Sequence, residues 1–306
     1  MAYIYYGILT FFILLINNPK IIWLQIPPSP VLHVAFIYKT ILFRRRTIII
    51  ADCHNGAFIS PFINFPFVVR LLNRCDVVLV HNPVLEGQVE SFGIRKAKVA
   101  VLTDPPTKPP SIQLSPLKIV DGARRYLVFP CSYAKDEPLE AIMRAMSYCR
   151  DIDLYLTGNF KKAQGLLVNL DIPNNVKFTG FLSEIDLDRL IYNSLAVIAF
   201  TTVDNIQLCS AAEGIGLGKP LILADRKAVR EIYRKGRVLV EPTNHDSIAA
   251  GIKKLEVDIN KLGQEAQELR LDLEKIWHYR ALKIFGKYGF LKESQDEPVC
   301  ENLQSM

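Results

Sequence analysis

The chain has 306 residues, of which 50% are hydrophobic, 22% are charged and 10% are aromatic, and its formal net charge is +6. This length predicts two domains, and the composition excludes disordered, collagen-like and low-complexity proteins. The mean hydropathy of +0.16 would suit a membrane protein. However, no stretch reaches the roughly 20 uninterrupted apolar residues of a spanning helix, which excludes a polytopic membrane protein.

The most apolar segment is Tyr3–Ile16, which is followed by the polar residues 17–20. It is too short to span a bilayer comfortably, and it lacks the basic start and the small-residue cleavage site of a signal peptide. We therefore expect an unexported, cytoplasmic protein. Peripheral contact of this segment with the inner face of a membrane remains open.

Six cysteines are scattered along the chain without any Cys-x-x-Cys pair, at Cys53, Cys75, Cys131, Cys149, Cys209 and Cys300. This spacing argues against a zinc site and against a disulfide framework, so no metal is predicted and a reducing cytoplasm fits best.

Two basic clusters stand out, Arg44–Arg46 and Lys161–Lys162. Such runs are usually solvated surface. The alternative is attraction to anionic lipid headgroups or to a substrate that carries a diphosphate. Basic and aromatic residues do not interleave, so a nucleic-acid partner is not expected.

Short β-branched runs alternate with amphipathic helical segments along the chain, which predicts parallel sheets covered by helices. The predicted helices include 138–149, which Asp136 would cap, 184–194 after Ser183, and the charged segment 258–290. The ten predicted strands are Ile21–Ile26, Thr47–Ala51, Val77–Val80, Val99–Leu102, Tyr126–Phe129, Leu154–Thr157, Val176–Thr179, Ala196–Phe200, Pro220–Ala224 and Arg237–Val240.

A proline-rich stretch from Asp104 to Leu117 separates two sets of alternating elements and is interpreted as a linker. The predicted organisation is an N-terminal domain with the linker over residues 1–117, a C-terminal domain over 118–290, and a tail over 291–306.

Ligands of open α/β sheets bind outside the carboxyl ends of the strands, so the residues that follow each predicted strand are the candidates for a site. Those of suitable chemistry are Asp52, His54, Ser132, Lys135, Gly158, Gly180, Phe181, Asp204 and Asn205. His81 also follows a strand, but the Asn-Pro pair after it is typical of a turn.

Glu213 lies in a small-residue helix that is followed by Gly-x-Gly-x-Gly-Lys-Pro and a strand. The glycines allow two interpretations: close approach of backbone to a phosphorylated ligand, or tight packing of helix against strand. The segment is not a Rossmann fingerprint, because its glycines close the helix, and it is not a Walker loop, because proline follows the lysine.

The runs "NVKFTGFLS", "AAEGIGLGKPLILAD" and "LVEPTNHDSIAAGI" resemble the nucleotide-sugar-binding domain of GT-B glycosyltransferases of the family 4 type. In the first half, "IPPSP", the run from Asp52 to Asn55, and Asp104-Pro105-Pro106 are similar to motifs of the dolichol-pathway beta-mannosyltransferases. The resemblance covers most of residues 20–290. It implies two Rossmann-like domains and transfer of a sugar from a GDP- or UDP-sugar to a lipid-linked or polysaccharide acceptor.

By this resemblance, Glu213 would contact the donor ribose, and Gly180 with Phe181 would border the base. The family's preceding glutamate falls at Asn205, with Asp204 beside it as a substitute. Of the two cations that bind the donor diphosphate in relatives, only Lys135 is present, with Ser132 as a hydroxyl donor and Gly158 in the neighbouring loop.

Asp52 or His54 could orient or deprotonate the acceptor hydroxyl, since a carboxylate or an imidazole at a strand end suits that task. The glycine-rich acceptor loop of relatives is absent, so the N-terminal domain is expected to be incomplete. Two alternatives stay open: a catalytically inactive paralogue that acts as a binding or assembly subunit, and an epimerase-like use of the same fold.

Overall fold

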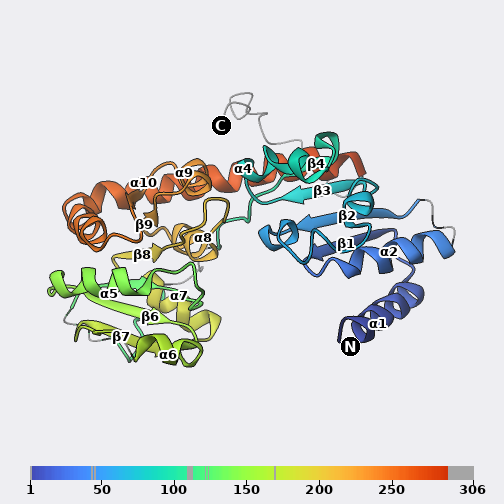
Figure 1. Cartoon of the computed structure of the whole chain (residues 1–306). Coiled ribbons are helices and arrows are strands. Elements are labelled where there is room, and N and C mark those ends of the chain that lie inside the picture. The colour runs from blue at the N-terminus through green and yellow to red at the C-terminus, as the bar shows by residue number, and fades with distance from the viewer. Residues whose placement is uncertain are drawn as a thin grey trace. The chain divides into compact units, whose positions relative to one another are not determined.

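The computed structural model describes residues 2–42, 44, 46–108, 113–120, 122, 124–168 and 170–288 (Figure 1). The predicted tail 291–306 and part of the proline-rich stretch lie outside these residues. The chain divides into two compact units. Unit 1 contains Met1–Thr103 and the residues from Arg280 to Tyr288, and unit 2 contains Asp104–Tyr279.

Unit 1 is built on a four-stranded parallel sheet in the order β1-β2-β3-β4. The strands are β1 (Ile21–Ile26), β2 (Ile48–Cys53), β3 (Val77–Val80) and β4 (Val99–Val101). The register places Asp52 of β2 beside Gln25 of β1 and Leu79 of β3. Because the strands are parallel, all four carboxyl ends lie at one edge of the sheet.

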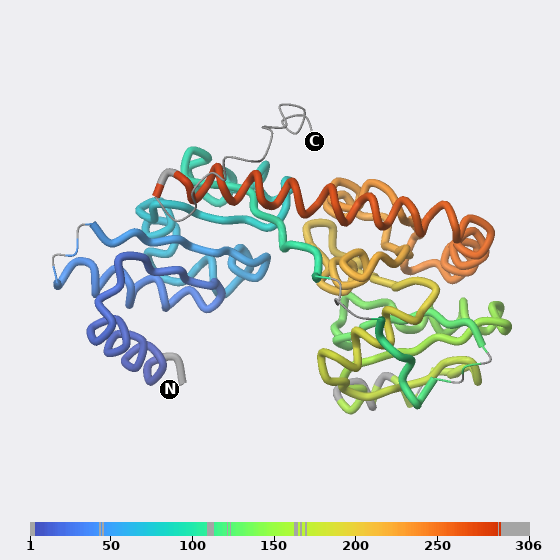
Figure 2. The backbone as a smooth tube through the Cα atoms, turned by 180° about the vertical axis from the view of Figure 1, so that it is seen from behind, coloured from blue at the N-terminus to red at the C-terminus, as the bar shows by residue number. Residues whose placement is uncertain are grey.

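The helices of unit 1 are α1 (Ala2–Asn17), α2 (Pro30–Ile41), α3 (Val68–Leu72) and α4 (Pro83–Glu86), with short turns η1 (Asn55–Phe58), η2 (Val89–Phe92) and η3 (Lys96–Lys98). Helix α1 packs against α2, as both ribbon views show (Figure 2), and it places Leu14 in the core. Trp23, on the edge strand β1, stays 48% exposed.

Unit 2 is built on a six-stranded parallel sheet in the order β10-β9-β8-β5-β6-β7. The strands are β5 (Tyr126–Phe129), β6 (Asp153–Thr157), β7 (Val176–Gly180), β8 (Ala196–Ala199), β9 (Leu221–Ala224) and β10 (Arg237–Val240). The helices are α5 (Leu139–Tyr148), α6 (Gln164–Leu167), α7 (Glu184–Tyr192), α8 (Cys209–Gly216), α9 (Lys227–Ile232) and α10 (His245–Phe285), with the turn η4 (Phe160–Ala163); α10 leads into η5 (Gly286–Tyr288) of unit 1.

All ten predicted strands are present, four with the predicted bounds and the others with bounds that differ by at most two residues. Strands β3, β5, β8 and β9 are buried along their whole length, which explains their uninterrupted apolar sequences. The predicted capping of α5 by Asp136 is wrong. The helix begins after Pro138, and the Asp136 carboxylate accepts a hydrogen bond from Thr201 instead.

The strand order of unit 2 reverses between β5 and β8. From β5 the chain adds β6 and β7 on one side, and then returns to add β8, β9 and β10 on the other. The loops after β5 and β8 therefore lead to opposite faces of the sheet, and the switch point between them at the carboxyl edge is the place where folds of this kind have their ligand crevice. Within the described residues, no helix has the length and apolar character needed to cross a membrane.

Tight packing explains Gly214, which lies within α8. A Cβ at Gly214 would lie 2.7 Å from Leu221 Cδ2 and 3.0 Å from Val197 Cβ, so α8 lies directly on β8 and β9. Val197 and Leu221 are fully buried. At this position the structure supports the packing interpretation of the glycine.

Replacing Gly214 by alanine should lower the free energy of unfolding by about 1–3 kcal/mol, because the core at β8 and β9 must be overpacked. Gly263, in the middle of α10, has open space at its Cβ position. Gly263→Ala should therefore raise the free energy of unfolding by about 0.5–1 kcal/mol. Chemical denaturation of both variants tests the contrast, and effects of the same sign would contradict this account of α8.

Candidate functional site

Two candidate sites lie at the carboxyl edges of the two sheets, and each is described within its own unit. In unit 1, Asp52 lies near the end of β2, His54 follows that strand, and His81 follows β3. Since β2 and β3 are adjacent and parallel, the three side chains converge at one edge.

The Asp52 carboxylate is held from two sides. Its Oδ2 accepts a hydrogen bond from Trp23 Nε1 at 2.9 Å, and its Oδ1 lies 2.8 Å from His81 Nε2. The side chain is 16% exposed. Burial opposes ionisation of Asp52, but the hydrogen bonds from His81 and Trp23 and the potentials of His81 and His54 outweigh it, so the pKa lies below its usual value. Asp52 is therefore a carboxylate at neutral pH.

The His54 ring stacks on the His81 ring, with centroids 4.3 Å apart and an interplanar angle of 25°. Its Nε2 lies 3.2 Å from Gln25 Nε2, and its backbone N–H donates to the Ile26 carbonyl at 2.9 Å. These contacts hold both the backbone and the ring of His54 in place. Because the Asp52 oxygens are already engaged, His54 is the better placed of the two predicted catalytic residues for proton transfer.

One group among the described residues could hold a metal ion. It consists of Asp52, His54 and His81, whose ligand atoms lie within 4.8 Å of one another. Two imidazoles and a carboxylate suit a transition metal. The prediction that the protein uses no metal therefore stays a prediction.

Sequence reasoning gave too little weight to His81 and did not single out Trp23. The turn expected after His81 exists, because Asn82 caps α4 and accepts a hydrogen bond from Leu85 N. That turn does not prevent His81 from reaching Asp52. The available signal was position: His81 follows β3 just as His54 follows β2.

In unit 2, one side chain joins the two loops of the crevice between β5 and β8. Thr201 Oγ1, after β8, donates to Asp136 Oδ2, after β5, at 2.6 Å. Thr202 N also donates to the Asp136 carbonyl at 2.9 Å. These loops carry Ser132, Lys135, Asp204 and Asn205, which the structure thus brings to one place in the fold.

The loop after β5 is organised by Glu137, which sequence reasoning did not single out. Its carboxylate accepts hydrogen bonds from Ser132 N and Oγ, each at 3.1 Å, and from Ala134 N at 2.8 Å. Both donors of Ser132 are therefore engaged with Glu137. Lys135 is exposed in the same loop, and Lys161 is exposed after β6.

Gly158 and Gly180 hold the next two loops together. Both have positive φ angles, and Gly158 N donates to the Gly180 carbonyl at 2.9 Å. A Cβ at Gly158 would lie 2.0 Å from the Cys131 carbonyl oxygen, so only glycine allows this close approach. Phe181 follows with 86% of its surface exposed.

Glu213 lies on α8 at the β8 side of the crevice. Burial and the charges of Asp188 and Glu184 on α7 raise the pKa of Glu213 to about 7. Asp204 is 70% exposed, and its carboxylate lies 3.9 Å from Arg226, which also pairs with Glu241 at 3.0 Å. Glu213 therefore changes charge near neutral pH, a property that sequence reasoning could not supply.

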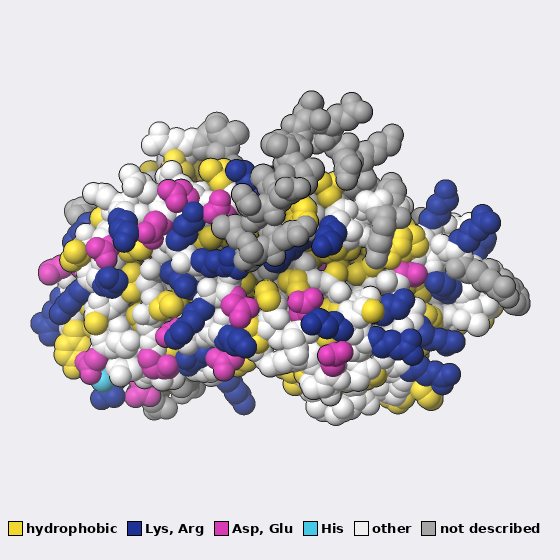
Figure 3. Space-filling model, turned by 90° about the horizontal axis from the view of Figure 1, so that it is seen from above, with side chains coloured by type: hydrophobic (Ala, Val, Ile, Leu, Met, Phe, Trp, Pro, Cys, Tyr) yellow, Lys and Arg dark blue, Asp and Glu magenta, His cyan; other side chains and the backbone are white. Residues whose placement is uncertain are grey.

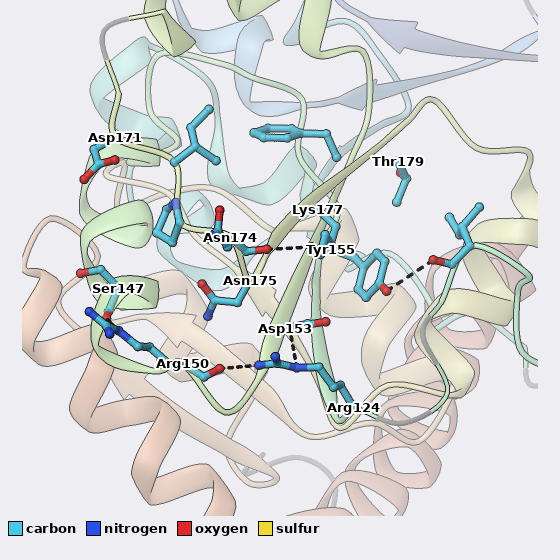
Figure 4. Close-up of a pocket in the computed structure, with 14 residues that line it drawn as sticks. Arg124, Ser147, Arg150, Asp153, Tyr155, Asp171, Asn174, Asn175, Lys177 and Thr179 are labelled. Carbon is cyan, nitrogen blue, oxygen red and sulfur yellow. Dashed lines mark hydrogen bonds and ion pairs between the residues drawn. The ribbon is translucent and has the colours of Figure 1, made fainter.

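A cavity of about 840 Å³ in unit 2 lies at the opposite edge of the sheet, at the amino ends of β5, β6 and β7 (Figure 4). Its cations are engaged within the protein. Arg124 Nε lies 3.0 Å from Asp153 Oδ1, and Lys177 Nζ donates to the Asn174 carbonyl at 2.7 Å. None of the predicted site residues lines this cavity, so it is distinct from the crevice between β5 and β8.

Replacing His81 by alanine should raise the pKa of Asp52, because a hydrogen bond and a positive potential are lost while burial remains. A carboxylate with a lowered pKa stabilises the fold above its unfolded pKa, and this stabilisation is lost as the pH falls through the lowered value. The variant should therefore lose part of its resistance to acid.

Carboxyl NMR titration of labelled aspartate measures this change. His245→Ala, in unit 2, is the matched control. An unchanged Asp52 titration in the His81 variant would show that the pair does not set the charge of Asp52.

Comparison with known proteins bears on both units. Residues 124–269 match the family described as "Glycosyl transferases group 1". This segment contains the whole sheet of unit 2 and ends within α10. A search of curated protein sequences finds no match.

Solved structures match across both units. HepE of Anabaena in complex with UDP superposes with a TM-score of 0.70 at 17% identity, over 88% of this chain and 79% of that chain. A UDP-forming α,α-trehalose-phosphate synthase from Burkholderia xenovorans gives 0.72 at 12% identity, over 94% and 79%. A glycosyltransferase from Rickettsia africae gives 0.68 at 15% identity, over 94% and 81%.

At these sequence identities the solved structures establish the fold alone. The sequence match relates residues 124–269 of unit 2 to the group 1 family. The two parallel sheets confirm the predicted pair of Rossmann-like domains. The chain therefore has the GT-B fold of these structures, and its residues 124–269 match the group 1 glycosyltransferase family.

Proposed function

We propose that the chain transfers a sugar from a nucleotide-sugar donor bound by unit 2 to an acceptor bound by unit 1. One observation carries the proposal: the family match and the candidate donor-binding residues fall in the same part of the chain. The segment that matches the group 1 family contains the crevice between β5 and β8, where Lys135, Asp204, Asn205 and Glu213 gather.

For the donor, the chemistry of unit 2 fits a nucleoside diphosphate. Lys135 and Lys161 are exposed cations at the carboxyl edge, and they would stabilise the charge of the departing diphosphate. The Glu213 carboxylate would accept hydrogen bonds from ribose hydroxyls. HepE was solved in complex with UDP and with UDP-glucose, which favours a UDP-sugar, with a GDP-sugar as the alternative.

For the acceptor, we propose that His54 accepts the proton of the attacking hydroxyl. Asp52 and His81 position the His54 ring through the stack and the hydrogen bond at 2.8 Å. The proposal gives the proton transfer to His54 itself and assigns no step to a metal, while Asp52 is engaged by Trp23 and His81. A general base at this position contributes about 10²–10⁴-fold to the rate.

The surface of α1 favours a lipid-linked acceptor over a polysaccharide. Ile4, Ile8, Phe12 and Ile16 form an exposed apolar stripe four residues apart, with exposures of 54–81%. Exposed cations, including Lys20 and Arg46, lie just before the first two strands of the same unit. An apolar helix face beside cations suits peripheral contact with an anionic bilayer.

Glu213→Gln should weaken donor binding about tenfold, through loss of charged hydrogen bonds to the ribose. It should also remove a pH dependence. In the unaltered protein, affinity should rise between about pH 6 and about pH 8 as Glu213 ionises through its pKa of about 7.

Calorimetric titration with UDP- and GDP-sugars measures both effects. Glu140→Gln, at an exposed position on α5, is the control that should keep the original affinity and pH dependence. If neither class of nucleotide sugar binds at millimolar concentration, the proposed donor site is wrong.

A second candidate function, a binding or assembly subunit without turnover, is favoured by two observations. Asn205 stands where the family has a glutamate, and both hydrogen-bond donors of Ser132 are engaged with Glu137. Such a protein would bind the donor and leave it unreacted.

His54→Ala should reduce sugar transfer by about 10²-fold or more while donor affinity is unchanged, because His54 lies in unit 1. Transfer is measured with lipid-linked and with soluble glycan acceptors, and His278→Ala on α10 is the control. Equal transfer by the His54 variant would contradict the assignment of the base. Donor binding without transfer in the unaltered protein would favour the binding subunit.

A further inference from the structure

A hollow of about 680 Å³ lies in unit 1, lined by Val69, Arg70, Asn73, Arg74 and Arg95. Asn73 and Arg74 come between α3 and β3, and Arg95 comes just before η3 and β4. The hollow therefore lies at the amino ends of these strands. Asp52, His54 and His81 lie at the opposite, carboxyl edge of the same sheet.

The backbone around the hollow is held in place by Asn73. Its Nδ2 donates to the Gly93 carbonyl at 2.8 Å, and its Oδ1 accepts from Arg95 N at 2.7 Å. Gly93 has a φ of +79°, and a Cβ there would lie 3.3 Å from Val69 Cγ1. The turn that carries Arg95 is thus fixed against the end of α3, beside Arg70 and Arg74.

No acidic side chain lines the hollow. Across the described part of the chain, no ion pair or side-chain hydrogen bond engages the guanidinium groups of Arg70, Arg74 or Arg95. Arg70 lies on α3 and Arg74 lies just beyond the end of that helix, so two like charges border the hollow. The nearby carboxylate of Asp76 is engaged elsewhere, since it accepts from Ile49 N at 2.8 Å and pairs with Lys39 at 3.6 Å.

Cations outnumber carboxylates at the amino edge of this sheet, where Asp76 directly precedes β3. One cation precedes each strand: Lys20 before β1, Arg46 before β2, Arg74 before β3 and Lys98 before β4. Figure 3 shows Lys and Arg side chains gathered at the right of the view, at the end of unit 1 where its strands begin. Such a field draws anions toward the hollow.

We infer that this hollow binds a phosphate group. Arginine presents several donors in a planar fork that matches phosphate oxygens, and three such groups converge here on a space without a competing carboxylate. The cavity of unit 2 in Figure 4 lacks this property, because its Arg124 pairs with Asp153. The phosphate belongs to a free anion or to a lipid headgroup, which have the same chemistry.

The test uses the full chain and two probes. Inorganic pyrophosphate is titrated by calorimetry, and cosedimentation is measured with phosphatidylcholine vesicles that either contain or lack phosphatidic acid. The test variant combines Arg74→Gln with Arg95→Gln. The control is Arg144→Gln on α5, which makes the same kind of substitution at one site outside the hollow. We expect the double variant to weaken binding of one probe at least tenfold, and the control to keep it.

Arg95→Lys separates loss of charge from loss of fold, because it keeps the cation and should retain part of the affinity. Loss of pyrophosphate binding in the double variant assigns a free anion. Loss of binding only to vesicles that contain phosphatidic acid assigns a headgroup. If the double variant matches the control with both probes, the inference is wrong. No nucleotide sugar enters the experiment, so its failure leaves the proposed transfer reaction untouched.

Discussion

The hydrogen bond between Thr201 and Asp136 spans the point where the strand order of unit 2 reverses. Parallel strands place all their carboxyl ends at one edge, and the reversal sends the loops after β5 and β8 to opposite faces. Without a tie, these loops would be free to separate. The bond at 2.6 Å holds them together, and the candidate donor residues Lys135, Asp204 and Asn205 all lie in the loops that it joins.

The strands of the unit 1 sheet are also parallel, so its carboxyl edge and its amino edge carry different residues and differ in their chemistry. At the carboxyl edge, a carboxylate is held by an indole and an imidazole, and a second imidazole stacks on the first. At the amino edge, every strand is preceded by a cation, and Arg70, Arg74 and Arg95 surround a hollow without a carboxylate. One sheet can therefore serve proton transfer at one edge and anion binding at the other.

The strands could be predicted because buried parallel strands are continuous apolar runs, and β3, β5 and β8 are of this kind. Asp52 and His54 could be singled out because they lie at a strand end. The pairing of Asp52 with His81 could not, since it joins residues 29 apart through the register of β2 and β3.

Contacts that residue spacing does not show engage two of the groups that sequence reasoning singled out. Asp136 lies before a helix, where a cap is expected, but the reversal of strand order brings Thr201 within hydrogen-bond distance of it. Glu137 accepts hydrogen bonds from both donors of Ser132, and the predicted donation of Ser132 to a diphosphate stays a prediction. In both cases a tertiary or loop contact, invisible in residue spacing, engages the group.

Amide hydrogen exchange with and without a UDP-sugar tests most directly whether the donor binds at the crevice between β5 and β8. We predict slower exchange in residues 130–136 and 200–208 and at the start of α8, because the donor would order the loops that Asp136 joins. Slower exchange confined to residues 171–177, which line the cavity at the amino edge, would contradict the account.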